Sequence, residues 1–222
     1  MTTPLFQDRR DAGRALARRL SGYAHRSDVR ILALPRGGVP VAFEVAHALL
    51  APMEVFVVRK LGVPNREEVA LGALAPGVRH VNQRMVQLLG IDAEALDQVI
   101  GKEQAELERR DRLYREGRPL PDLQGACVIL VDDGLATGST MHAALLALRL
   151  LGPARSVVAV PVAAEDTCAE LRRVADEVVC ARMPHPFVAV GRWYRDFSQT
   201  GDDEVHDLLA AHAATWTPER AP

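Results

Sequence analysis

Two adjacent carboxylates at the end of an apolar segment are the first residues of this sequence that could do chemistry. Asp132 and Asp133 follow the run Ala126 to Val131, whose composition suits a strand buried on both faces of a parallel sheet. Next comes the small-residue turn Ala136–Thr140, with backbone N–H groups and three hydroxyls at the start of a predicted helix. Such a turn can bind a phosphate dianion, so this order of residues predicts a βα phosphate-binding unit. The alternative is a buried strand and a capped helix with two incidental acids.

A second glycine-rich turn is predicted about a hundred residues earlier. Pro35-Arg36-Gly37-Gly38 follows the expected strand Val29 to Leu34, and Pro40 then opens the helical run Val41 to Leu50. Paired glycines let a backbone approach an anion closely, and Arg36 adds positive charge. Taken alone, the turn is equally compatible with a purely structural role, because paired glycines before a helix are common.

A third candidate is the cation pair Arg59 and Lys60, which closes the predicted strand Glu54 to Val58. Two neighbouring cations at a strand end could bind an anionic leaving group. The alternative is a pair of solvated surface cations.

The elements that must position these residues alternate between strands and helices. An amphipathic helix is predicted over Asp8 to Leu20, a hairpin around Pro76-Gly77 and a long charged helix over Ile91 to Gly117. Further strands are predicted near 156–160 and 177–180, and further helices over 141–151, 165–175 and 205–214. This alternation predicts an α/β fold with a doubly wound, mainly parallel sheet.

Residues 128–140 (VILVDDGLATGST) resemble, at every motif position, the 5-phosphoribosyl-1-pyrophosphate (PRPP) binding loop of the type I phosphoribosyltransferases. The resemblance implies that Asp132 and Asp133 bind the ribose 2′ and 3′ hydroxyls. It also implies that the 5′-phosphate is bound by the loop residues Ala136, Thr137, Gly138, Ser139 and Thr140. Carboxylates accept hydrogen bonds from vicinal hydroxyls, so the implied roles agree with the residue chemistry.

The same resemblance gives the other two turns a role. Pro35–Gly38 is similar to the family's pyrophosphate loop, which often contains a strained peptide, and Arg59-Lys60 is similar to an Arg-Lys pair of orotate- and adenine-type enzymes. Pyrophosphate would contact Arg36, Gly37, Gly38, Arg59 and Lys60. The resemblance further implies catalytic roles for Arg36, Lys60, Asp132 and Asp133, a Mg2+ ion carried mainly by PRPP with no direct protein ligand, and a mobile loop within 61–82.

The acceptor of the phosphoribosyl group stays open. Family members hold it under a hood outside the core, here expected from the flanks 1–28 and 181–222 around a core of about 29–180. Trp193 and Tyr194 could stack on a planar base; equally, they could pack the tail against the core. Enzymes for 6-oxopurines carry an acid/base Asp where this chain has Ala136, which argues against hypoxanthine and guanine.

Composition fits a single phosphoribosyltransferase domain over residues 1–222. No apolar run is long enough to span a membrane, and the net charge of -2 gives no general reason to bind nucleic acid. Cys127, Cys168 and Cys180 lack metal-type spacing and are expected to be reduced, in keeping with a cytoplasmic protein. The family resemblance implies a homodimer that acts in nucleotide synthesis or salvage. The alternative function is a PRPP- or nucleotide-sensing regulatory protein without transferase activity.

Overall fold

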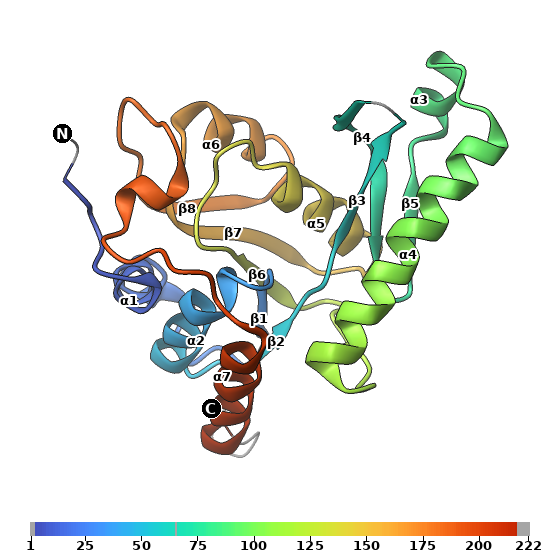
Figure 1. Ribbon diagram of the computed structural model, residues 1–222. Coiled ribbons are helices and arrows are strands. Elements are labelled where there is room, and N and C mark those ends of the chain that lie inside the picture. The colour runs from blue at the N-terminus through green and yellow to red at the C-terminus, as the bar shows by residue number, and fades with distance from the viewer. Residues whose placement is uncertain (1–2, 65, 217–222) are drawn as a thin grey trace.

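The central layer of the molecule is a five-stranded sheet in which every neighbouring pair of strands is parallel (Figure 1). The computed structural model describes residues 3–64 and 66–216. In spatial order the strands are β2 (Met53–Val55), β1 (Val29–Ala33), β6 (Cys127–Val131), β7 (Arg155–Val162) and β8 (Glu177–Arg182).

Helices cover both faces of this sheet because its strands are apolar on both sides. Along β6, Ile129 belongs to one buried cluster and Leu130 to another on the opposite face. The first cluster includes side chains of α1 (Arg9–Arg19), α2 (Gly38–Leu49) and α7 (Asp202–Thr215). The second includes side chains of α5 (Ser139–Arg149) and α6 (Glu165–Leu171). The predicted doubly wound α/β sheet is therefore confirmed.

The strand order reverses between β1 and β6. From β1 the chain continues to β2 on one side, whereas β6, β7 and β8 extend the sheet on the other side. In open α/β sheets a ligand binds in the crevice at such a point, beyond the carboxyl ends of the strands. The turn after β1 is Pro35–Gly38 and the turn after β6 is 132–138, so the fold places two predicted site segments at this crevice.

A smaller antiparallel sheet projects beside the central layer (Figure 1). It consists of β3 (Arg59–Val63), β4 (Arg66–Ala75) and β5 (Val78–Val81), and is followed by α3 (Gln83–Leu88) and α4 (Ala93–Arg115). The predicted hairpin at Pro76–Gly77 joins β4 to β5, with Gly77 in the left-handed region at φ 74°. Most of the segment 61–82, for which a mobile loop was expected, forms this sheet, and position 65 within it lies outside the described residues.

One strand boundary was predicted wrongly, and it matters for the site. The strand expected over Glu54 to Val58 ends at Val55, and Arg59 begins β3 of the antiparallel sheet instead of closing a parallel strand. Phe56 and Val57 are buried even though they lie between the two sheets. Because the whole run is apolar or buried, hydrophobicity could not show that the parallel strand ends at Val55.

Several helix boundaries also differ from the prediction, most by one to three residues. Helix α2 begins at Gly38, two residues before Pro40, and α6 ends at Leu171 rather than at Ala175. None of the helices in the described ranges has the length and apolarity needed to cross a bilayer.

The two flanks of the chain meet each other. Phe6 forms a parallel bridge with Tyr194, and the N–H groups of Leu5 and Phe6 donate to the carbonyl of Trp193. Two short 3-10 helices, Ser21–Tyr23 and Val190–Trp193, belong to these flanks. The Tyr194 hydroxyl donates to the carbonyl of Asp133 at 2.5 Å, so the joined flanks border the strand ends.

Candidate active site

The acidic pair lies at the end of β6 in a largely enclosed position. The backbone N–H of Asp133 donates to Oδ1 of Asp132 at 2.8 Å, and Nε of Arg9 donates to Oδ2 of Asp133 at 2.8 Å. Burial, and then the charge of Asp133, raise the pKa of Asp132 well above its usual range. Burial also raises the pKa of Asp133, while the Arg9 guanidinium opposes that rise. Burial of two neighbouring carboxylates destabilises the folded state, and groups with such strongly shifted pKa values are typical of binding sites.

The turns after β1 and β6 contact each other directly. A Cβ atom placed on Gly37 would lie 2.1 Å from Oδ2 of Asp133, and one placed on Gly38 would lie 2.6 Å from the carbonyl oxygen of Val131. Only glycine permits this approach, because any side chain would overlap the neighbouring turn. The Pro35–Arg36 peptide bond is cis. The glycine-rich turn and the acidic pair, predicted from separate segments, thus come together beyond the carboxyl ends of β1 and β6.

The small-residue turn passes into α5 with its hydroxyls grouped together. Gly138 adopts φ 68° and precedes Ser139, the first residue of the helix, while the hydroxyl oxygens of Thr137 and Ser139 lie 3.0 Å apart. The Thr167 hydroxyl donates to the carbonyl of Ala136 at 2.6 Å, which ties the turn to α6. The first N–H groups of a helix lack intrahelical partners, so this turn can present several donors to one phosphate.

Arg36 is paired with an acid at the start of the last helix. Oδ1 of Asp202, the first residue of α7, lies 3.5 Å from Nη1 of Arg36. The Tyr114 hydroxyl donates to the same Oδ1 at 2.6 Å. Burial and this hydrogen bond raise the pKa of Tyr114 to about 12. Helix α7 therefore contacts the glycine-rich turn through Asp202, and α4 is linked to it through Tyr114 and the same carboxylate.

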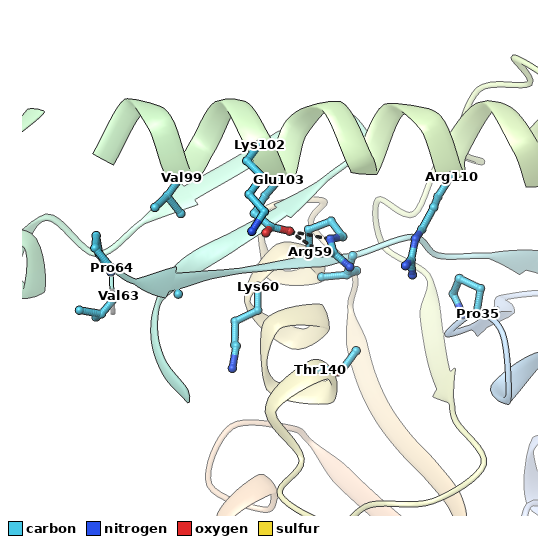
Figure 2. Close-up of a pocket in the computed structure, with 12 residues that line it drawn as sticks. Pro35, Arg59, Lys60, Val63, Pro64, Val99, Lys102, Glu103, Arg110 and Thr140 are labelled. Atoms are coloured by element: carbon cyan, nitrogen blue, oxygen red, sulfur yellow. Dashed lines mark hydrogen bonds and ion pairs between the residues drawn. The ribbon is translucent and has the colours of Figure 1, made fainter. Parts of the chain in front are cut away.

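Arg59 and Lys60 line a cavity of about 400 Å3 between β3, α4 and the start of α5 (Figure 2). Arg59 is not a free surface cation, because its Nη2 lies 2.6 Å from Oε2 of Glu103 on α4. Thr140 and Pro35 also line the cavity, so it adjoins both the small-residue turn and the glycine-rich turn. The cation pair is thus brought to the same region as the other predicted site residues.

Helix α4 contributes three charged residues that the sequence analysis missed. Lys102, Glu103 and Arg110 line the cavity, and Figure 2 shows them descending from one face of the helix toward β3. Arg110 also pairs with Glu106 at 2.6 Å. Acids and bases alternate along the whole helix, which is typical of a solvated surface, and nothing in that pattern distinguishes the residues facing the cavity.

The two candidate stacking residues are enclosed. Trp193 and Tyr194 are 5% and 4% exposed and share a buried cluster with Phe6 and Ala12. Neither ring offers an open face to a planar ligand in this conformation. Their burial fits the packing alternative, in which they join the two flanks to the core.

Residues 6–192 match the family described as the phosphoribosyl transferase domain. This match covers the acidic pair, both turns and the cation pair. The chain belongs to the phosphoribosyl transferase family. The sequence-based recognition of this family is therefore confirmed.

Several relatives of this phosphoribosyl transferase domain are known. It is 50% identical over 206 residues to two Mycobacterium tuberculosis proteins, each named "Putative phosphoribosyl transferase": MT0597 of strain CDC 1551 / Oshkosh and Rv0571c of strain ATCC 25618 / H37Rv. The match covers 92% of this chain and 46% of each relative, so the chain spans about half the length of the curated relatives it matches. The crystal structure of TT1426 from Thermus thermophilus is similar over 96% of this chain and 99% of that chain, with a TM-score of 0.85 and 39% identity.

Proposed function

We propose that this protein is an enzyme that transfers the 5-phosphoribosyl group of PRPP to a nitrogen of a base or amine, with release of pyrophosphate, in nucleotide synthesis or salvage. The observation that carries the proposal is the convergence of three segments distant in sequence. The glycine-rich turn of Arg36 contacts the acidic pair, and the cavity of Arg59 and Lys60 adjoins both turns.

PRPP would lie across the crevice with its ribose at the acidic pair. Asp132 and Asp133 supply acceptors for the 2′ and 3′ hydroxyls, and Ala136–Thr140 supplies N–H and hydroxyl donors for the 5′-phosphate. The contact between the Thr167 hydroxyl and the Ala136 carbonyl supports this assignment, because it fixes the shape of the phosphate turn without using its donors.

The pyrophosphate group would extend toward Gly37, Gly38 and the cations Arg36, Arg59 and Lys60. These cations lie where negative charge builds up as the leaving group departs. Magnesium prefers oxygen ligands and keeps several waters, so an ion held mainly by PRPP fits a site whose nearby acids would face the ribose. When bound, it would neutralise charge on the pyrophosphate oxygens.

The reaction then needs little covalent help from the protein. The lone pair of the acceptor nitrogen forms a bond to C1′ while the bond from C1′ to the pyrophosphate oxygen breaks, and its electron pair leaves with pyrophosphate. The proton that the acceptor nitrogen carried is released to solvent. The transition state resembles an oxocarbenium ion. The proposed contributions of the protein are orientation of the ribose and neutralisation of the leaving group.

The acceptor is proposed not to be hypoxanthine or guanine. The methyl group of Ala136 cannot exchange a proton with a purine, and the carbonyl of this residue already accepts a hydrogen bond from Thr167. Efficient turnover of either 6-oxopurine would contradict this part of the proposal.

The direct test is release of pyrophosphate from PRPP with Mg2+ and a pool of nucleobases and amines. We expect release that requires an acceptor and is lost in Asp133→Ala, and we expect Thr137→Ala to weaken PRPP binding measured by calorimetry. Arg149→Ala, at the far end of α5, serves as the matched control and should behave as the wild type. Unchanged PRPP affinity in both Asp133→Ala and Thr137→Ala would refute the site assignment.

A further inference from the structure

Arg9 lies outside the predicted site residues but contacts one of them, Asp133, directly. Its Nε donates to Oδ2 of Asp133 at 2.8 Å, and its Nη1 donates to the carbonyl of Ser198 at 2.6 Å. Its guanidinium carbon lies 4.0 Å from the ring centre of Phe197. The side chain of Arg9, the first residue of α1, is only 12% exposed. It is held by three partners: a carboxylate, a backbone carbonyl and an aromatic ring.

These contacts belong to a ring of interactions that begins and ends at Asp133. The ring of Phe197 lies 5.0 Å from the ring of Tyr194, and the Tyr194 hydroxyl donates to the Asp133 carbonyl. Arg9 therefore holds the carboxylate while Tyr194 holds the backbone of the same residue. The side-chain and backbone orientations of Asp133 are both fixed by the joined flanks.

The ion pair also lies directly against the glycine-rich turn. A Cβ atom on Gly37 would meet Oδ2 of Asp133 at 2.1 Å and Nε of Arg9 at 3.3 Å. The space around the carboxylate is thus limited on two sides. The rigid guanidinium donates its Nε–H to this carboxylate and its Nη1–H to the Ser198 carbonyl, so the two hydrogen bonds together fix the cation against Asp133.

The charges around Asp133 explain why a cation is needed there. Asp132 follows the same strand and presents a second carboxylate, and Tyr194 contributes a neutral hydroxyl. Burial and the neighbouring acid favour the protonated form of the pair, and Arg9 is the cation that opposes this effect at both residues. Without it, Asp133 would keep its proton to a higher pH.

We propose that Arg9 is a positioning residue, which holds the Asp133 carboxylate charged and oriented for the ribose hydroxyls of PRPP. This inference rests on the proposed function, because it names PRPP as the ligand. Arg9 acts through Asp133, whose carboxylate it contacts at Oδ2. The N-terminal flank thereby becomes part of the binding machinery rather than a cover alone.

The test is calorimetric PRPP binding with Mg2+ between pH 6 and pH 9 for the wild type, Arg9→Gln, Arg9→Lys and Arg10→Gln. Arg10 is the matched control, because it is the next residue of α1, is about half exposed and pairs with Glu44. We expect Arg9→Gln to lose affinity roughly 10- to 100-fold at pH 6 and clearly less at pH 9, the size being that of a charged hydrogen bond. Arg9→Lys should recover part of the affinity, and Arg10→Gln should match the wild type.

Each outcome decides between distinct conclusions. Suppose that the wild type binds PRPP and that Arg9→Gln loses the same factor of PRPP affinity at every pH. This result would overturn the proposal, because a purely structural role predicts no pH dependence. If Arg9→Gln does not fold, Arg9→Lys decides. The lysine ammonium cannot reproduce the rigid pair of hydrogen bonds to Asp133 and Ser198, so undiminished affinity there would overturn the orienting role. Absence of PRPP binding by the wild type would reject the proposed function, and this inference with it.

Discussion

Replacing Gly38 by alanine tests whether contact between the two turns supports both folding and PRPP binding. The added Cβ would lie 2.6 Å from the Val131 carbonyl oxygen and 3.0 Å from the Asp132 Cα. Both neighbours are backbone atoms, so no side-chain rotation can relieve the overlap. The glycine-rich turn must then move away from the acidic pair.

The expected magnitude follows from two opposing terms. Overpacking costs about 1–3 kcal/mol, and alanine returns up to about 1 kcal/mol of helix propensity at the start of α2. The net loss of about 1–2 kcal/mol corresponds to a fall in Tm of roughly 2–8 °C for a domain of this size. Displacement of Asp132 should also lower PRPP affinity by about 10-fold or more, because ligand geometry is altered at the ribose.

Thermal unfolding and calorimetric PRPP binding measure both effects, with Gly101→Ala as the matched control. Gly101 lies inside α4 with no atom within 4 Å of an added Cβ, so that variant should gain up to about 1 kcal/mol and bind PRPP normally. A Gly38→Ala protein with wild-type Tm and wild-type PRPP affinity would refute the reasoning.

Two further predictions concern residues that hold the site elements together. Arg59→Ala and Glu103→Gln should show a coupling energy of about 1–2 kcal/mol in a double-mutant cycle of unfolding free energies, because the 2.6 Å ion pair between these residues joins β3 to α4. If the two effects on the unfolding free energy are additive within about 0.3 kcal/mol, the prediction is contradicted. His212 accepts a hydrogen bond from the Met53 N–H, and burial, then His47, lower its pKa below 6.5. A histidine whose pKa is lowered by folding contributes stability above pH 6.5, and this stability is lost as the pH falls through the folded-state pKa. Between about pH 7.5 and pH 5, the Tm of the wild type should therefore drop more than the Tm of His212→Gln. Equal slopes would show that His212 is not responsible.

Local sequence patterns were sufficient to predict several parts of the protein. The apolar run before Asp132 is typical of a buried strand, and the small residues after it can form a phosphate turn and start a helix. Alternation of strands and helices then specified a doubly wound sheet. These features depend on neighbouring residues and on backbone geometry, so one sequence is enough to predict them.

Which charged residues contact one another could not be predicted without the folded structure. Arg9 reaches Asp133, Asp202 reaches Arg36, and Glu103 reaches Arg59, although the members of each pair are distant in sequence. Nothing in local spacing selects one partner among the 27 lysines and arginines and the 29 acids of the chain. Such pairs depend on how helices pack against the sheet, and that packing is set by the whole core. Sequence patterns therefore located the candidate turns, whereas the packing of the fold determined which charged residues contact them.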